Sequence, residues 1–157
     1  MNNPNPASLG SMAATILNQL TADLAPDAQR FFTEPTGIHA PLLVLRKRDV
    51  LFGPIFLVGH QMKPKTRTSE ALYDPQVTLL RVASGDWVPL SIVTPFRTLA
   101  TARASGNLQV MDPAEHERLV HRVNVWMRNV ELARYPLPSG VVVERRRIGA
   151  LGAHAAE

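Results

Sequence analysis

The sequence predicts an α+β fold in which an antiparallel four- to five-stranded sheet packs against an N-terminal and a C-terminal helix. Three observations predict it: apolar residues at helical spacing near both ends, short β-prone runs between turn signals in the middle, and connections too short for parallel crossovers. A chain of 157 residues, 45% of them hydrophobic, can bury about 70% of its unfolded surface in a single domain. We expect this domain over residues 11–140, between a flexible tail (1–10) and a basic extension (141–157) that is partly disordered or adds a strand.

The N-terminal helix is expected to follow Ser11, which stands at an N-cap position. Its apolar face consists of residues three and four positions apart, namely Met12, Ile16, Leu17, Leu20 and Leu24. Pro26 then indicates either a kink or the first turn of a short second helix over residues 27–32. The run Glu34-Pro35-Thr36-Gly37 predicts the end of the helical region.

Four strands are predicted in the middle of the chain, at residues 42–47, 55–63, 76–83 and 87–94. Gly53-Pro54 separates the first pair and Ser84-Gly85-Asp86 the second, so both pairs are expected to be antiparallel.

Alternation assigns the side chains of the fourth strand to two faces. Val88, Leu90 and Ile92 are expected on one face, and the other face would hold Trp87, Pro89, Ser91 and Val93. Because Pro89 has no N–H to donate, this strand is expected at the edge of the sheet or with that side free. Residues 96–110 fit either a helical turn or an irregular segment that ends at Ser105-Gly106-Asn107.

The C-terminal helix has the strongest local signal. Asp112 is a predicted N-cap, Pro113 suits the first helical position, and Glu115 is the acid of a capping box. One apolar stripe follows, formed by Leu119, Val123, Trp126, Val130 and Ala133. The helix is expected to stop near Arg134, and residues 141–143 then fit an added strand.

Composition excludes several classes of site. The chain has no cysteine, which rules out a disulfide framework, a thiolate zinc site, an iron–sulfur cluster and a cysteine nucleophile. No apolar run approaches the roughly 20 residues of a membrane span, and the N-terminus lacks the pattern of a signal peptide. We therefore expect a cytoplasmic protein with no membrane partner.

The histidines do not form a metal motif. His116 and His121 are five residues apart and point to different sides of a helix, so we expect His116 at the surface and His121 beside Glu117. His60 has two interpretations, a hydrogen-bonded core residue or a general base paired with Asp74. No nucleophile elbow, Ser-x-x-Lys or phosphate loop is present. We expect no enzyme, and no catalytic residue, metal or cofactor.

The positive charge is concentrated in one stretch. Residues 41–70 carry a formal charge of +4, which equals the excess of the whole chain. The candidate binding residues in this stretch are basic: Arg46, Lys47, Arg48, Lys63, Lys65 and Arg67. Antiparallel pairing would put the first three and the last three at opposite ends of a hairpin. A second basic candidate is the triplet Arg145, Arg146 and Arg147.

Aromatic residues supply the candidate anchors. Trp87 opens an apparent edge strand and is expected to be half-exposed, and Tyr73 and Phe96 are further anchors. Aromatic residues are only 6% of the chain and none stands among the lysines, which argues against a base-stacking surface.

Three segments carry a family resemblance: Val58-Gly59-His60, Asp74-Pro75-Gln76-Val77 and Trp87-Val88-Pro89-Leu90. They resemble a group of uncharacterised small bacterial domains associated with plasmids, phages and integrated elements. Where that group has an acidic Gly-Asp segment between the histidine and the Asp-Pro, this chain has the basic residues 63–67. The resemblance implies a mobile-element accessory protein of unknown activity, and it carries no catalytic residue across.

Two functional hypotheses follow. The first is a small non-enzymatic interaction protein that binds a host protein or nucleoprotein complex, for example to inhibit a host defence system. The alternative is an accessory or regulatory protein that binds nucleic acid through the basic loops. A hydrolase using His60 and Asp74 is a minority interpretation. Homodimerisation through an unpaired edge strand is expected to be compatible with either of the first two.

Overall fold

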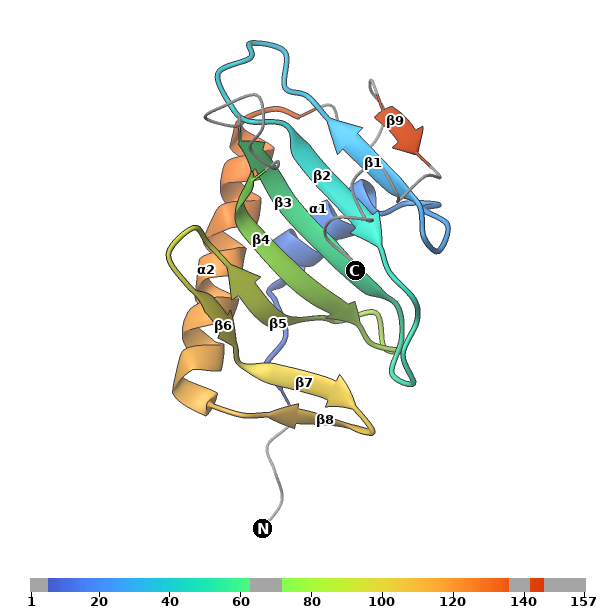
Figure 1. The fold of residues 1–157 in the computed structure, drawn as a ribbon, viewed down its shortest axis with the longest axis vertical. Coiled ribbons are helices and arrows are strands. Elements are labelled where there is room, and N and C mark those ends of the chain that lie inside the picture. Colours follow the sequence, from blue (N-terminus) through green and yellow to red (C-terminus); the bar gives the residue numbers. More distant parts are fainter. Residues whose placement is uncertain (1–5, 63–71, 136–141, 146–157) are drawn as a thin grey trace.

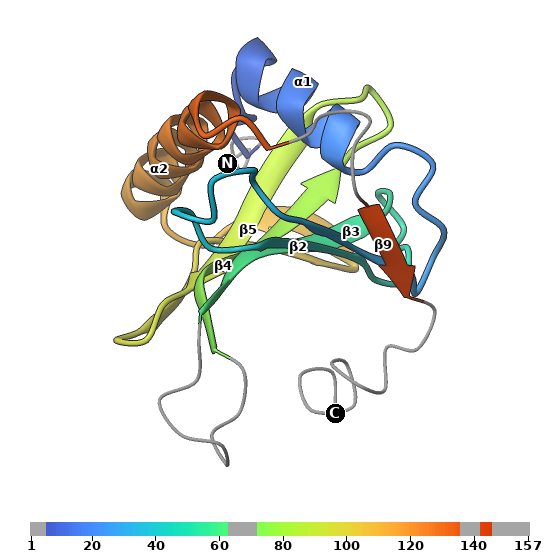
Figure 2. The same cartoon turned by 90° about the horizontal axis from the view of Figure 1, so that it is seen from above.

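The computed structural model of the chain describes residues 6–62, 72–135 and 142–145. Two helices cover one face of a twisted antiparallel sheet (Figures 1 and 2), which confirms the predicted α+β class. In chain order the elements are α1 (Ser11–Leu20), β1 (Gln29–Phe32), β2 (Leu42–Arg46), β3 (Ile55–Met62), β4 (Leu72–Arg81), β5 (Trp87–Val93), β6 (Thr98–Ala100), β7 (Ala102–Ser105), β8 (Asn107–Val110), α2 (Pro113–Leu132) and β9 (Val142–Arg145).

The main sheet is wider than predicted. It has seven strands in the order β6-β5-β4-β3-β2-β1-β9, rather than four or five, and β7 and β8 form a separate hairpin. The four strands predicted in the middle of the chain are β2 to β5, and each pairs with its neighbour in the antiparallel sense. The three segments of the family resemblance therefore lie on the adjacent strands β3, β4 and β5.

The short second helix predicted over residues 27–32 is wrong. Asp23 and Asp27 adopt left-handed backbone conformations, with φ of 58° and 64°, so the helical region ends before β1. The Arg30 guanidinium reaches back to the end of α1, where it donates to the carbonyl oxygen atoms of Leu20 and Ala22. β1 then pairs with β2 on one side and β9 on the other, and these long-range pairings override the local helical signal.

The ambiguous stretch of residues 96–110 forms β6, β7 and β8. Gly106, with φ of 75°, makes the turn between β7 and β8 in a conformation that glycine adopts without strain. The hairpin contributes to a small second core on the face of the sheet opposite the helices, where the buried residues are Leu80, Val88, Leu90 and Ala102.

A bulge in β5 changes the predicted faces of that strand. Thr78 pairs with Ser91 and Leu79 pairs with Pro89, which leaves Leu90 as an extra residue. Val88 and Leu90 accordingly share the second core, while Ile92 joins Trp87 in the main core. β6 pairs only with Ser91, Ile92 and Val93, so no strand of the described chain pairs with that side of β5 at Pro89.

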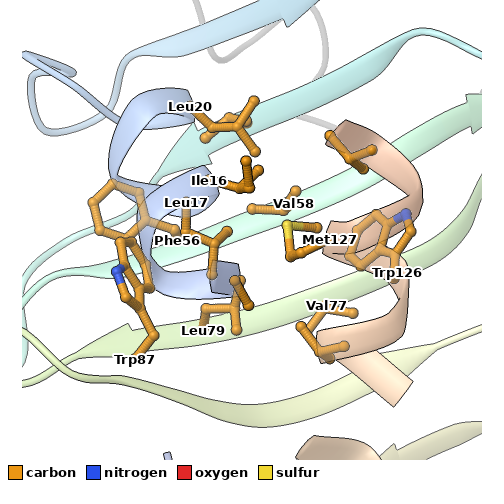
Figure 3. Packing of buried hydrophobic residues seen from close by; sticks show 14 of the residues in the cluster. Ile16, Leu17, Leu20, Phe56, Val58, Val77, Leu79, Trp87, Trp126 and Met127 are labelled. Carbon is orange, nitrogen blue, oxygen red and sulfur yellow. The ribbon is translucent and has the colours of Figure 1, made fainter. Parts of the chain in front are cut away.

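The main core lies between the helices and the sheet (Figure 3). Leu17 and Leu20 of α1 and Met127 of α2 are fully buried against Val58 and Trp87 of the sheet. Deep burial of this kind contributes about 1.5–3 kcal/mol per large apolar side chain. No helix among the described residues is long and apolar enough to cross a membrane.

The two helix starts differ from one another. Asp112 caps α2 by accepting a hydrogen bond from the Glu115 N–H at 3.2 Å, which confirms the prediction, and the predicted stripe faces the core. α1 is capped by Gly10 rather than Ser11, and no side chain provides the cap. The Gly10 N–H instead donates to Asn124 Oδ1 at 2.9 Å, so α2 holds the start of α1.

Candidate binding site

A cleft of about 470 Å³ opens between the β5–β6 turn and the first half of α2. We call it the arginine cleft and define it by Phe96 and Arg97 of the turn, Leu99 of β6, and Arg118 and Arg122 of α2. Leu99 packs against the core and belongs to the apolar part of the lining, and the three arginines supply its positive charge. Asp74 and Glu115 also line the cleft, so its formal charge is +1.

The turn from Thr94 to Arg97 fixes the position of Phe96. The Thr94 N–H donates to the Arg97 carbonyl at 2.9 Å, and Thr94 Oγ1 accepts from the N–H groups of Phe96 (3.4 Å) and Arg97 (3.3 Å). A threonine hydroxyl commonly stabilises a turn in this way. The Phe96 side chain is left 94% exposed at the rim of the cleft.

The side of the cleft that α2 forms carries two arginines on one face of the helix. Arg118 and Arg122 are four residues apart, which places them one above the other on α2. Arg118 forms an ion pair with Glu115. In the described part of the chain, Arg97 and Arg122 have neither a hydrogen-bonded side-chain partner nor an ion pair. Their guanidinium groups can therefore donate to a carboxylate in the bidentate geometry that arginine favours.

His60 belongs to a different, structural cluster. Its Nε2 accepts a hydrogen bond from Trp126 Nε1 at 2.8 Å, and its Nδ1 faces the Ala40 carbonyl oxygen at 3.2 Å. This pair of contacts requires a neutral ring protonated at Nδ1. Burial, together with the nearby His39, lowers the pKa of His60, against opposing contributions from the Ala40 carbonyl and Asp74. Both ring nitrogens are engaged, which favours the hydrogen-bonded core interpretation over the general base.

Tyr135 completes the His60 cluster. Its hydroxyl donates to the Ala40 carbonyl oxygen at 2.5 Å, and burial raises its pKa to about 12. A cavity of about 330 Å³ lies beside it, lined also by His39, His60 and Asn129. Asp74 acts on His60 only through its charge: no hydrogen bond joins the two side chains, and they line different cavities among the described residues.

His116 was predicted at the surface, and this is wrong. The ring is 2% exposed, and its nitrogens contact Thr101 Oγ1 at 2.9 Å and the Ala7 carbonyl oxygen at 3.0 Å. It joins the N-terminal segment to the β6–β7 connection. His121 is exposed and forms no ion pair with Glu117 within the described residues. No cluster of metal-ligating side chains occurs among residues 6–62, 72–135 and 142–145.

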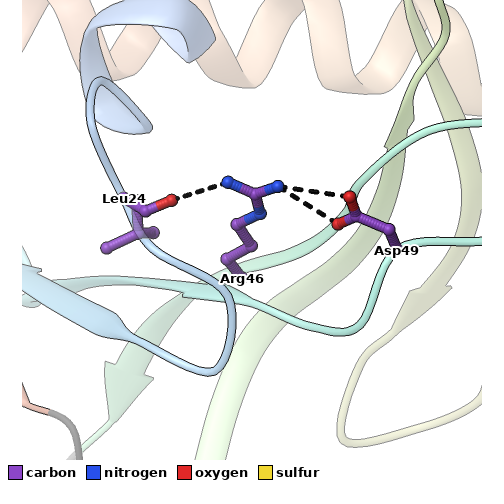
Figure 4. A network of polar contacts seen from close by, with 3 residues as sticks. All are labelled: Leu24, Arg46 and Asp49. Atoms are coloured by element: carbon purple, nitrogen blue, oxygen red, sulfur yellow. Dashed lines mark hydrogen bonds and ion pairs between the residues drawn. The ribbon is translucent and has the colours of Figure 1, made fainter.

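Arg46, a predicted binding residue, has a role within the fold (Figure 4). Its guanidinium donates to the Leu24 carbonyl oxygen at 2.9 Å and to Asp49 at 3.2 Å, which joins the end of β2 to the connection after α1. Lys47 and Arg48 are exposed and line a different cavity beside the β2–β3 connection.

Trp87 is not a surface anchor. The side chain is fully buried, its Nε1 donates to Asn18 Oδ1 at 3.0 Å, and its ring lies 5.1 Å from that of Phe56. The expectation of a half-exposed tryptophan is therefore wrong, whereas Phe96, the other candidate anchor with a described side chain, is 94% exposed.

The remaining candidates lie outside the described residues or have only their backbone described. Tyr73 is placed by its backbone in β4 and Arg145 by its backbone in β9. Outside the described residues lie Lys63, Lys65, Arg67, Arg146 and Arg147.

Sequence reasoning did not identify Arg97, Arg118 and Arg122 as site residues. The spacing of Arg118 and Arg122 on the polar side of a predicted helix was the available signal. Nothing local relates them to Arg97, because the β5–β6 turn and α2 meet only through the tertiary fold.

Comparison with protein-family models, curated proteins and solved structures gave no match to this chain. The geometry of the arginine cleft is therefore the basis for inferring the function of this chain.

Proposed function

We propose that the protein is a non-enzymatic binding protein whose arginine cleft recognises an acidic segment of a partner protein. The observation that carries this proposal is the 94% exposed Phe96 beside two guanidinium groups, those of Arg97 and Arg122, that have no carboxylate partner among the described residues. Arginine and aromatic side chains together are typical of the residues that dominate protein interfaces.

The free energies expected from an ion pair and from a buried aromatic ring assign different roles to these side chains. An exposed ion pair contributes about 0.2–1 kcal/mol, whereas full burial of a phenylalanine contributes about 1.5–3 kcal/mol. Phe96 would therefore supply much of the affinity when a partner covers it. The arginines would select acidic sequences and exclude basic ones.

The charge distribution favours a protein over a nucleic acid. With Asp74 and Glu115 in its lining the cleft has a formal charge of only +1, which suits one or two carboxylates held by Arg97 and Arg122 better than a continuous phosphate backbone, whose binding requires many neutralising cations. The other described basic candidates, Lys47 and Arg48, follow β2, and three strands separate β2 from β6 in the sheet. Nucleic-acid binding through the basic loops is the alternative, and it predicts a steep loss of affinity with salt. Action on a host defence system stays a prediction.

The test uses a fluorescein-labelled eight-residue peptide that alternates glutamate and valine, here called the Glu-Val peptide, and a Gln-Val peptide as its neutral control. Fluorescence anisotropy would compare the wild type with Arg97→Glu/Arg122→Glu. The matched control is Arg103→Glu/Arg128→Glu, which reverses two exposed arginines outside the cleft.

We expect the Glu-Val peptide to bind the wild type and the control alike, and to lose at least tenfold in affinity (about 1.4 kcal/mol) on the cleft variant. Equal losses on both variants would contradict the proposal, because they would indicate unspecific attraction. No binding of the Glu-Val peptide would also contradict it. Tighter binding of duplex DNA, with the steep salt dependence of phosphate contacts, would support the alternative.

A further inference from the structure

β6 is the outermost strand at one end of the seven-stranded sheet (Figure 1), at the opposite end from β9. It pairs with β5 alone, in the register Ser91 with Ala100, Ile92 with Leu99 and Val93 with Thr98. An edge strand presents backbone groups that another extended chain can pair with. The arginine cleft includes Leu99, the central residue of this strand.

The hydrogen bonds at the two ends of β6 determine which groups are free. The Thr94 N–H donates to the Arg97 carbonyl at one end, and the Thr101 N–H donates to the Leu90 carbonyl at the other, both at 2.9 Å. Hydrogen-bonded and non-hydrogen-bonded pairs alternate along an antiparallel ladder. Leu99 therefore bonds to β5, and the N–H and C=O groups of Thr98 and Ala100 point away from it. β6 pairs with no other described strand, so these four groups are available.

The side chains of β6 show which side of the sheet an added strand would direct toward the arginine cleft. Leu99 is half-buried against the core on the helix side, whereas Thr98 and Ala100 are exposed. A chain added alongside β6 would direct every second side chain to the helix side. Those side chains would approach Arg118 and Arg122, and the remainder would project from the opposite face.

From this juxtaposition we infer that the partner segment binds by strand addition: an extended peptide pairs with the Thr98 and Ala100 backbone and places an acidic residue at every second position over the arginine cleft. This inference rests on the proposed function and specifies its binding mode. Main-chain hydrogen bonds would give affinity, and the alternate side chains would give specificity.

A second copy of this chain fits the same edge less well. Antiparallel pairing of two β6 strands would continue the sheet and put both α2 helices on the same side. The exposed Arg118 and Arg122 of the two copies would then face each other without added negative charge. Repulsion between like charges disfavours this dimer and favours an acidic occupant.

The experiment uses two N-methylated forms of the Glu-Val peptide with identical charge. One carries methyl groups on the valine amides and the other on the glutamate amides. In an added strand the amides of one alternate set bond to β6, and those of the other set point to solvent. We expect one form to lose at least tenfold in affinity and the other to bind like the parent peptide.

A substitution in β6 tests the same backbone hydrogen bonds from the side of the protein. Ala100→Pro removes one outward N–H without removing a hydrogen bond to β5, and proline is tolerated at such edge positions. We expect at least tenfold weaker binding of the Glu-Val peptide, with the thermal unfolding midpoint measured to check that the fold is kept. The peptide comparison on the wild type decides the question if this variant does not fold.

The outcomes separate the two proposals. Binding that depends on Arg97 and Arg122 but treats both methylated peptides like the parent would overturn strand addition and leave the proposed function standing. Peptide binding that is insensitive to the Arg97→Glu/Arg122→Glu change would overturn the proposed function itself. A concentration-dependent dimer in light scattering that Ala100→Pro abolishes, and that the Glu-Val peptide does not displace, would assign the edge to a second copy and overturn the inference.

Discussion

The indole Nε1 of Trp126 donates a hydrogen bond to Nε2 of His60 at 2.8 Å, and this contact ties α2 to β3. The other ring nitrogen faces the Ala40 carbonyl oxygen at 3.2 Å. The neutral imidazole thus joins the helix to the segment before β2. A proton on Nε2 would set two donors against each other, so the fold favours the neutral ring.

The first prediction concerns the pH dependence that His60 creates. Its pKa is lowered from 6.5 in the native state, chiefly by burial, so the unfolded chain binds more protons as pH falls through 6.5. This contribution to stability is complete above pH 6.5 and is lost as pH falls toward the native pKa. Urea unfolding from pH 8 to pH 5 should show a smaller decrease in the free energy of unfolding for His60→Gln than for the wild type. Identical pH profiles would contradict the role of the neutral ring.

The second prediction concerns the Trp126 hydrogen bond itself. Trp126→Phe keeps an aromatic ring on the core side of α2 and removes the donor to His60. We expect a loss of about 0.5–1.5 kcal/mol in the free energy of unfolding from the hydrogen bond, with a further loss for the smaller ring. In the His60→Gln background the same substitution should cost less, and a double-mutant cycle measures this coupling. A coupling energy of zero would show that the two side chains act independently.

The third prediction concerns Glu34, which holds the loop after β1. Its carboxylate accepts from Thr36 Oγ1 at 2.6 Å and from the N–H groups of Thr36 and His39, each at 3.0 Å. These bonds, the Thr36 hydroxyl first, lower the pKa of Glu34 from 4.5 to about 2. Its contribution to stability is complete above pH 4.5 and is lost as pH falls toward 2. Glu34→Gln should flatten the acid unfolding profile between these values. A profile that keeps the slope of the wild type would contradict this role.

The fourth prediction compares the two helix starts. Asp112→Ala removes the side-chain cap of α2 and should cost about 0.5–2 kcal/mol in the free energy of unfolding. Ser11→Ala is the matched control, because Gly10 rather than Ser11 caps α1 and no side chain provides the cap. It should lie within about 0.5 kcal/mol of the wild type. Equal losses in chemical denaturation would show that Ser11 also has a capping role.

Local signals account for what the sequence predicted well. α2 begins with Asp112 and Pro113, whose cap chemistry acts within one turn, and its apolar stripe has a single period. The strands β2 to β5 are likewise marked by β-prone runs between turn residues. Neither signal depends on distant parts of the chain.

The errors arose where distant segments decide the structure. β1 is a strand because β2 and β9 pair with it, and β9 is more than 100 residues away in the sequence. Trp87 is buried because α1 covers it and Asn18 accepts its N–H. The bulge at Leu90 reversed the expected face of Ile92, and such an insertion has no clear sequence signature.

The candidate site likewise combines residues that the sequence pointed to with residues that only the tertiary fold brings together. The sequence named Phe96 as a candidate anchor only because it is aromatic, and the structure leaves its side chain 94% exposed. The arginines around it come from a turn and a helix that only the fold brings together. The basic stretch that dominates the charge of the sequence contributes Arg46 to a contact within the fold instead.

The central claim, that the arginine cleft binds an acidic segment, is tested most directly by mapping the amide chemical shifts of ¹⁵N-labelled protein during titration with the Glu-Val peptide. We predict that the largest shift changes occur at Phe96, Arg97, Leu99 and Arg122, and that the Gln-Val peptide produces none at equal concentration. Largest changes at Lys47 and Arg48, or equal changes at every exposed basic residue, would contradict the claim.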